Sequence, residues 1–488
     1  MMVSLLYPSS ETQWDSAPDS GWEARASDLE LEHLLNAMSA DHPEIAEVCR
    51  HVLNTSLQSP EEIRYRQEIL QDFLAQPALL LRLYDRCTAA EEKRRSSWYR
   101  LTSPHLSTTY SSAADLLKIY LEALVQIRKE VENQPFSSAG LRRFSAVLAQ
   151  ELSDQYLDRL RKLEPGITEE DSILISAGFG PFLQGVSYTK RQKRKGISRL
   201  QWLLLPSYTI ADRDMNGAAD LGIRRDRAIN EAANAMAQAA DNLEQFLNNL
   251  RKELAFYVGA LHLFDRFRQL QLPVCFPVLT GGHHRLWENL YDGSLALITC
   301  GAVVGNTMES SDQTHYLITG ANQGGKTTFL RSVGQCQLMA QCGLFVCAKR
   351  CQLPLMRVIA THFKREEDAQ MDSGKLDEEL ARMSCIIDHM KSGGMLLSNE
   401  SFSSTNDLEG SDILSQITQA LLERNVEVFT VTHLINYAMT CENAPQTLCL
   451  RAERKENGER TFRLVRGRPL QTAFGEDLYD KIFGEEKG

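Results

Sequence analysis

The sequence predicts two kinds of structure in one chain of 488 residues: a long, mostly α-helical part, followed by an α/β domain. Apolar residues recur at three- and four-residue steps through much of residues 28–163, which is typical of amphipathic helices. Further along the chain, short apolar runs alternate with helical segments, and this pattern predicts a largely parallel sheet covered by helices. We therefore expect a polar tail at residues 1–27, a helical core and lever domain at 28–275, and the α/β domain at 276–488.

Composition and charge narrow the class of protein. Apolar residues make up 43% of the chain, and the formal net charge of −11 argues against a basic surface that coats nucleic acid nonspecifically. The eleven cysteines include no CxxC pair of the kind that binds zinc, so buried free thiols are the simpler interpretation. The opening MMVSLLYPSSETQWD has no basic leader and no long apolar run. We expect a cytoplasmic protein without a membrane segment.

A long helix and a basic hairpin are expected before the α/β domain. The helical pattern from about residue 228 to residue 267 predicts a helix roughly 60 Å long at 1.5 Å per residue. Near residues 186–206, two short strands are expected to flank a basic turn that ends at Gly196. This turn is either a solvated tip or a phosphate-contacting tip whose binding would be weakened by salt. The candidate DNA contacts are Lys190, Arg191, Lys193, Arg194 and Lys195.

The segment TGANQGGKTTFLRS contains the most specific motif of the chain, with glycine, four residues, glycine, lysine and threonine in the spacing of a phosphate-binding P-loop. A buried strand is expected before it, and a helix is expected to begin near Lys326. Main-chain N–H groups and the positive helix end would then face an anion, Lys326 would neutralise phosphates, and the Thr327 hydroxyl would bind Mg²⁺. The motif therefore predicts an ATP and Mg²⁺ site that comprises Gly320, Ala321, Asn322, Gln323, Gly324, Gly325, Lys326, Thr327 and Thr328.

Two later strand ends carry the candidate catalytic groups. The apolar strand in GMLLSNE ends in Asn399 and Glu400, and P-loop enzymes hold Mg²⁺ and the attacking water at such a position. Asn399 is thus a candidate metal ligand beside Thr327, and Glu400 is the candidate general base. The alternative for Glu400 is a carboxylate that only solvates a turn. One strand later, VFTVTHL places His433 where it could bond the γ-phosphate or the attacking water.

A second anion site is expected where Ser373 and Gly374 precede a helix that begins near Leu376. A single chain has no second nucleotide to offer this helix end. The order of P-loop, Ser-Gly helix start, acidic strand end, Ser/Thr loop and histidine is that of the ATP-binding-cassette class, whose paired subunits complete each other's sites. We therefore expect a homodimer.

These motifs resemble the ATPase segment of the MutS family of DNA mismatch-repair proteins. The family loop typically reads TGPNMGGKST, and the chain matches it apart from Ala321, Gln323 and Thr327, where the family has proline, methionine and serine. The segments DSGKLDEELARM, NESFSSTNDLEG, VTHL and AFGEDLYDKIFG also resemble the family. The resemblance implies a P-loop domain of ABC type that hydrolyses ATP to ADP and phosphate, and a dimer whose helical levers move around DNA when its heads close.

The sequence departs from the family in two respects. Asn399 stands where the family usually has aspartate, and a neutral amide is a weaker ligand for Mg²⁺, so slower hydrolysis is expected. The N-terminal Phe-x-Glu wedge that reads mismatches has no counterpart near the start of the chain, so mismatch recognition is not expected. The leading interpretation is a DNA-acting ATPase in repair or recombination. The alternatives are an ATP-dependent switch or scaffold for protein partners, and a transporter ATPase subunit, which the missing LSGGQ stretch disfavours.

Overall fold

The computed structural model divides the chain into two compact units. Unit 1 contains residues 1–3, 81–135 and 142–251, and unit 2 contains residues 4–80, 136–141 and 252–488. This division differs from the expected order of tail, helical domain and α/β domain, because the N-terminal helices belong to the same unit as the large sheets. The structure describes residues 3–8, 14, 21–97, 106–155, 173–177, 186–190, 215–300, 303–365, 374–455 and 460–469.

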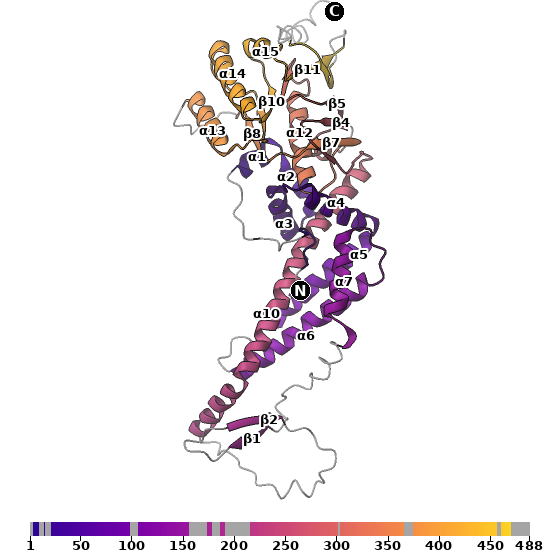
Figure 1. Ribbon diagram of the computed structural model, residues 1–488, viewed down its shortest axis with the longest axis vertical. Coiled ribbons are helices and arrows are strands. Elements are labelled where there is room, and N and C mark those ends of the chain that lie inside the picture. Colours follow the sequence, from indigo (N-terminus) through magenta and orange to yellow (C-terminus); the bar gives the residue numbers. More distant parts are fainter. Residues whose placement is uncertain are drawn as a thin grey trace, which may run out of the picture. The chain divides into compact units, whose positions relative to one another are not determined.

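Unit 1 consists of helices and one short pair of strands (Figure 1). The Tyr120 hydroxyl donates a hydrogen bond of 3.0 Å to the Glu244 carboxylate, which joins α6 to α10. Arg94 of α5 lies 3.4 Å from the same glutamate. Polar bonds therefore supplement the apolar packing of this unit. Its helices are most of α5 (Pro77–Ser97), α6 (Leu106–Val131), most of α7 (Ala139–Glu151) and the first part of α10 (Met215–Gln269).

The long helix α10 contains 55 residues, more than the sequence predicts. At 1.5 Å per residue it extends for roughly 80 Å. Its residues up to Arg251 belong to unit 1, and those from Lys252 onward belong to unit 2.

The structure describes only the first strand of the expected basic hairpin. Strand β2 (Val186–Lys190) pairs antiparallel with β1 (Ile173–Ala177), which precedes it in the chain, and residues 191–206, with the basic turn and the second expected strand, lie outside the described residues. Lys190 is the last residue of β2. The other candidate DNA contacts, Arg191, Lys193, Arg194 and Lys195, lie outside the described residues.

Unit 2 is organised around a six-stranded sheet with the order β12-β11-β6-β10-β9-β8. The five strands from β11 to β8 are parallel, as predicted, and β12 is antiparallel to β11 at the edge. The carboxyl ends of the parallel strands therefore meet at one edge of the sheet, where ligands of α/β proteins bind. The strands are β6 (His315–Thr319), β8 (Ile359–Phe363), β9 (Met395–Asn399), β10 (Glu427–Val431), β11 (Thr447–Arg454) and β12 (Arg460–Arg466).

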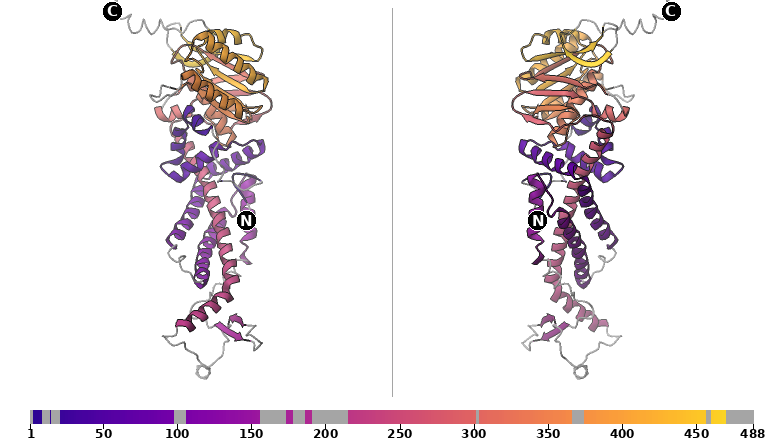
Figure 2. Two further views of the ribbon diagram at one scale, coloured as in Figure 1. Left: turned by 90° about the vertical axis from the view of Figure 1, so that its left-hand side faces the viewer. Right: turned by 90° about the vertical axis from the view of Figure 1, so that its right-hand side faces the viewer.

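Helices cover both faces of this sheet, because successive side chains of a strand point to opposite faces. Val428 packs in a cluster with α13 (Lys375–His389), α14 (Asp407–Glu423) and α15 (Ile435–Cys441), which are coloured orange in Figure 2. The next residue, Phe429, faces Trp287 and stacks on Tyr316 with ring centroids 4.1 Å apart. Trp287 also meets Phe329 of α12 (Lys326–Gln341), so this helix packs on the second face.

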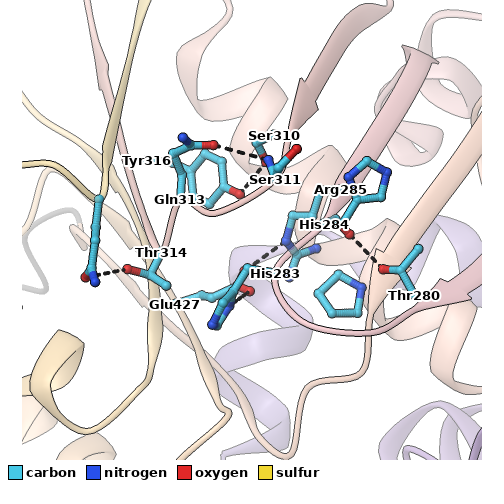
Figure 3. A network of polar contacts seen from close by, with 12 residues as sticks. Thr280, His283, His284, Arg285, Ser310, Ser311, Gln313, Thr314, Tyr316 and Glu427 are labelled. Atoms are coloured by element: carbon cyan, nitrogen blue, oxygen red, sulfur yellow. Dashed lines mark hydrogen bonds and ion pairs between the residues drawn. The ribbon is translucent and has the colours of Figure 1, made fainter.

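A smaller four-stranded sheet, which the sequence did not predict, packs beside the first. Its order is β3-β7-β4-β5, and only the β3–β7 pair is parallel. Arg285 of β4 and Glu427 of β10 are 0% and 1% exposed, and Arg285 Nε donates to the carboxylate at 2.8 Å (Figure 3). A buried ion pair thus joins the two sheets. The strands of the smaller sheet are β3 (Val278–Thr280), β4 (Arg285–Leu290), β5 (Asn306–Ser310) and β7 (Arg350–Pro354).

Part of the segment expected to be a polar tail packs into unit 2. Leu5 and Leu6 are fully buried, and the Leu5 amide donates to Glu253 of α10 at 2.7 Å. Trp22 begins the first helix, and Arg25 in that helix donates to the Ile359 carbonyl of β8. The remaining helices of the unit are α1 (Trp22–Asp28), α2 (Leu31–Ser39), α3 (Pro43–Asn54), α4 (Pro60–Ala75) and α11 (Gly293–Thr299).

No helix in the described part of the chain has the length and hydropathy needed to cross a membrane.

Candidate active site

The loop between β6 and α12 encloses the ammonium group of Lys326. Gly325 is the N-cap of α12 with a φ of 86°, and Lys326 begins the helix, as the sequence predicts. Lys326 is only 4% exposed, and its Nζ donates to the carbonyls of Gly320 at 2.8 Å and Ala321 at 3.0 Å. The lysine is therefore held over its own loop by main-chain oxygens.

The β11–β12 ribbon lies directly against this loop. A β-carbon on Gly320 or Gly324 would lie 2.8 Å from the β-carbon of Ala452 in β11. A β-carbon on Gly325 would lie 3.1 Å from the carbonyl oxygen of Phe462 in β12. Gly320 and Gly325 have φ values of 121° and 86°. Glycine is required at both positions because the backbone is left-handed and because the ribbon leaves no room for a side chain.

Arg460 at the start of β12 adds a charged contact to the loop. Its Nη1 donates to the side-chain oxygen of Gln323 at 2.8 Å, and Gln323 has a left-handed φ of 57°. Burial, with a smaller contribution from the Arg460 charge, lowers the pKa of Lys326 to about 8, and the Glu400 charge acts in the opposite direction. Arg460 is thus a second cation near the loop, and no sequence motif marks it.

The start of α12 and the end of β9 are linked through a pair of oxygen-bearing side chains. The Thr327 hydroxyl donates to the Asn399 amide oxygen at 3.1 Å. Hydroxyl and amide oxygens are among the ligands that hard divalent cations accept. The two predicted metal ligands therefore lie together, and their chemistry fits Mg²⁺.

Glu400 and His433 meet Lys326 at the ends of β9 and β10. His433 Nε2 lies 3.0 Å from Lys326 Nζ and 3.3 Å from the nearer Glu400 oxygen. One ring nitrogen cannot serve both partners in one protonation state, because it accepts from Lys326 only without a proton and donates to Glu400 only with one. The position of the His433 proton therefore decides whether the ring forms a hydrogen bond with Lys326 or with Glu400.

The hydrogen bond with His433 is the main cause that lowers the pKa of Glu400, and the positive charges of Lys326 and Lys364 act in the same direction. Burial opposes them. Glu400 also has a left-handed φ of 55°, which a non-glycine residue adopts only where the surrounding structure holds it. The result is an ionised carboxylate at a constrained position at neutral pH.

The structure brings together most of the residues that the sequence selected. Residues 320–328, Asn399, Glu400 and His433 all come from the carboxyl ends of the parallel strands or the start of α12. Gly374 is the N-cap of α13, which begins at Lys375, close to the predicted start. Ser373 lies outside the described residues.

Sequence reasoning missed the residues that approach from the β11–β12 ribbon and from β8. Ala452, Arg460 and Phe462 are far from the motif in the chain, and no local pattern marks them. His362 of β8 bonds Ser401, the residue after Glu400, and only the order of strands in the sheet reveals this contact.

Comparison with known families finds two matching models. Residues 58–270 match the MutS2 N-terminal domain, and residues 316–475 match MutS domain V. The second match contains the loop, Asn399, Glu400 and His433.

Individual relatives match over shorter segments. The endonuclease MutS2 of Thermus thermophilus is 35% identical over 118 residues, which are 24% of this chain and 16% of the relative. The DNA mismatch repair protein MutS of Thermotoga neapolitana is 31% identical over 168 residues, or 34% of this chain and 21% of the relative. The human MutS protein homolog 4 is 26% identical over 133 residues, or 27% and 14%. The matched segments thus span at most about a fifth of these relatives.

Proposed function

Because the chain belongs to the MutS family, we propose that it binds ATP with Mg²⁺ at residues 320–328 and hydrolyses it to ADP and phosphate. The observation that carries this proposal is that His433 Nε2 lies within 3.3 Å of both Lys326 Nζ and the Glu400 carboxylate, beside the Thr327–Asn399 pair. A structural cluster would need none of these groups at a loop with three glycines. A site that binds and hydrolyses a nucleotide can use each of them.

Phosphate binding follows from the donors of the loop. The free N–H groups at the start of α12 and the helix dipole favour an anion at this end. Lys326 has three donors: two go to the carbonyls of Gly320 and Ala321, and its Nζ also lies 3.0 Å from His433 Nε2. When a nucleotide binds, the ammonium group would exchange these partners for phosphate oxygens. Its positive charge would then be balanced by negative charges instead of by neutral carbonyl dipoles.

Metal binding would use Thr327 and Asn399, with Mg²⁺ neutralising phosphate charge during transfer. The amide of Asn399 supplies an oxygen without a negative charge. The protein therefore contributes less electrostatic attraction to the metal than a carboxylate at this position would.

Hydrolysis would use Glu400 as the base that accepts a proton from the attacking water. Its lowered pKa keeps it ionised, and His433 holds its orientation. When Lys326 turns to the phosphates, the His433 nitrogen loses one of its two partners and can donate to Glu400. Phosphate binding and orientation of the base are thereby coupled through one imidazole ring.

We further propose that two copies of the chain associate and act on DNA in repair or recombination. Support comes from the relatives, several of which are named DNA mismatch repair proteins, and from the helix start at Gly374. In a dimer, Gly374 and Ser373 of one copy would meet the nucleotide of the other.

A test of the ATPase compares the wild-type chain with Glu400→Gln in magnesium buffer. The expected result is unchanged ATP affinity and a loss of phosphate release of at least about 100-fold, since general-base catalysis contributes 10²- to 10⁴-fold. Glu423→Gln, an exposed glutamate on α14, is the control. Equal phosphate release by Glu400→Gln and wild type would refute the assignment of the base.

A separate test of the DNA proposal measures gel shifts of duplex, mismatched and junction DNA, with and without ATP, at two salt concentrations. Binding that weakens at higher salt supports the proposal, because phosphate contacts release counterions. Absence of any shift, with intact ATP turnover, would favour the switch that acts on protein partners.

A further inference from the structure

The turn that carries Glu400 also contains a buried serine, Ser401, whose hydroxyl bonds neighbouring strands. Ser401 is 1% exposed and lies between two residues with left-handed backbone, Glu400 at φ 55° and Phe402 at φ 59°. Such backbone costs free energy and persists only where neighbouring groups hold it. The Glu400 amide donates to the Val431 carbonyl of β10 at 2.8 Å, and the buried Ser401 hydroxyl supplies further bonds to this turn.

The Ser401 hydroxyl belongs to a chain of hydrogen bonds with a defined direction. It lies 2.6 Å from His362 Nδ1, 3.0 Å from the His362 main-chain oxygen and 2.7 Å from the Ser398 hydroxyl, so both acceptors of its one proton belong to His362. His362 Nε2 lies 3.2 Å from the main-chain oxygen of Glu379 in α13. Since a carbonyl oxygen can only accept, Nε2 carries the ring proton, and Nδ1 accepts from Ser401.

His362 remains neutral at physiological pH, which keeps this direction fixed. The ring is 0% exposed, and burial lowers its pKa to about 4. Ser398 then donates to Ser401, Ser401 donates to His362, and His362 donates to α13.

A second bond connects the same helix residue to the loop after Glu400. The Ser404 hydroxyl donates to the Glu379 side chain at 3.0 Å, and Glu379 is only 8% exposed. Glu379 lies in the second turn of α13, whose N-cap is Gly374. The main chain and the side chain of one α13 residue are therefore both bonded to groups that hold the turn of Glu400.

We propose that Ser401 and His362 are positioning residues that hold Glu400 for catalysis and make its placement depend on α13. This inference rests on the proposed function, because Glu400 matters only if the site hydrolyses ATP. A displacement of α13 at its N-terminal end is transmitted through Glu379 to His362 and Ser401.

The test separates the rate of hydrolysis from ATP affinity in Ser401→Ala. We expect its kcat to fall by roughly 10- to 100-fold, because a small misplacement of a catalytic group has effects of that size. ATP affinity should remain within about twofold of wild type, since the residue does not touch the loop 320–327. Ser401→Thr keeps the hydroxyl and should recover most of the activity.

Two further variants exclude a merely structural effect. Ser138→Ala removes a serine that is also 1% exposed but lies away from the site, and its kcat should equal that of wild type. His362→Ala should lower kcat, and the double variant with Ser401→Ala should lose no more than the worse single variant, because linked residues are not additive.

The outcomes distinguish the two proposals. No ATP turnover by wild type would overturn the proposed function and this inference with it. Normal kcat in Ser401→Ala, or additive losses in the double variant, would overturn the inference alone. A fall in kcat accompanied by an equal loss of ATP affinity in Ser401→Ala would also contradict it.

Discussion

The Thr327 hydroxyl donates a hydrogen bond to the Asn399 side-chain oxygen at 3.1 Å, so the start of α12 and the end of β9 meet at an uncharged pair. In a nucleotide site this pair would face Mg²⁺. The missing negative charge should appear as a low apparent affinity for Mg²⁺, which a single substitution can raise.

Asn399→Asp should lower the Mg²⁺ concentration that half-saturates ATP hydrolysis. The substitution keeps the shape of the side chain and adds a charge, and Mg²⁺ binds carboxylates more strongly than amides. The measurement is phosphate release as a function of Mg²⁺ at saturating ATP. Asn399→Ala, which removes the oxygen, should shift the half-saturation in the opposite direction. An identical Mg²⁺ dependence in all three proteins would contradict the metal assignment.

ATP affinity should fall as the pH rises through about 8, because Lys326 then loses the proton that attracts phosphate. Loss of one proton weakens binding by at most about tenfold per pH unit. Calorimetric titration between pH 7 and pH 9.5 would measure this fall. Arg460→Ala removes a nearby cation and should move the fall to higher pH. The same midpoint in both proteins would show that Arg460 does not influence Lys326.

The buried pair Arg285–Glu427 should be essential to the stability of unit 2. Glu427→Ala leaves the Arg285 charge buried without its counterion, which costs about 3–5 kcal/mol. Urea unfolding should show this loss, whereas Glu423→Ala at an exposed position should change stability by no more than about 0.5 kcal/mol. Similar stability of the two variants would mean that water or another group compensates Arg285.

His283 should make stability depend on pH. The hydrogen bond to Glu427 raises the pKa of His283 above 6.5, so its contribution is complete below pH 6.5 and is lost as pH rises through the folded value. His283→Gln should flatten the decline in unfolding free energy above pH 6.5. The neighbouring His284 bonds the Gln352 side chain instead, and His284→Gln should leave the decline intact. A decline that persists in His283→Gln would assign it to another group.

The parallel sheet and its loop were predictable because their signals are local. Buried strands such as β6, β9 and β10 read as apolar runs, and the glycines that precede Lys326 form a recognisable spacing. The order of motifs along the chain then indicated which strand ends would meet.

Long-range pairing was not predictable in the same way. Strand β3 pairs with β7, which lies far along the chain, and β12 reaches the loop only through its pairing with β11. The contact of Arg460 with Gln323 and that of His362 with Ser401 therefore have no signature in the sequence. The sequence of the N-terminal segment does not predict its packing, because Leu5, Leu6 and Trp22 are too few to show a period, although all three are buried.

The most direct test of the account is ATP binding in magnesium buffer by the wild-type chain and by Lys326→Ala. Lys391→Ala, which removes an exposed lysine of the same unit, is the matched control. The account predicts saturable binding by wild type and by Lys391→Ala, with a loss of at least about 100-fold in Lys326→Ala, since several charge-assisted hydrogen bonds disappear. Equal affinity of Lys326→Ala and wild type, or no binding by wild type, would contradict it.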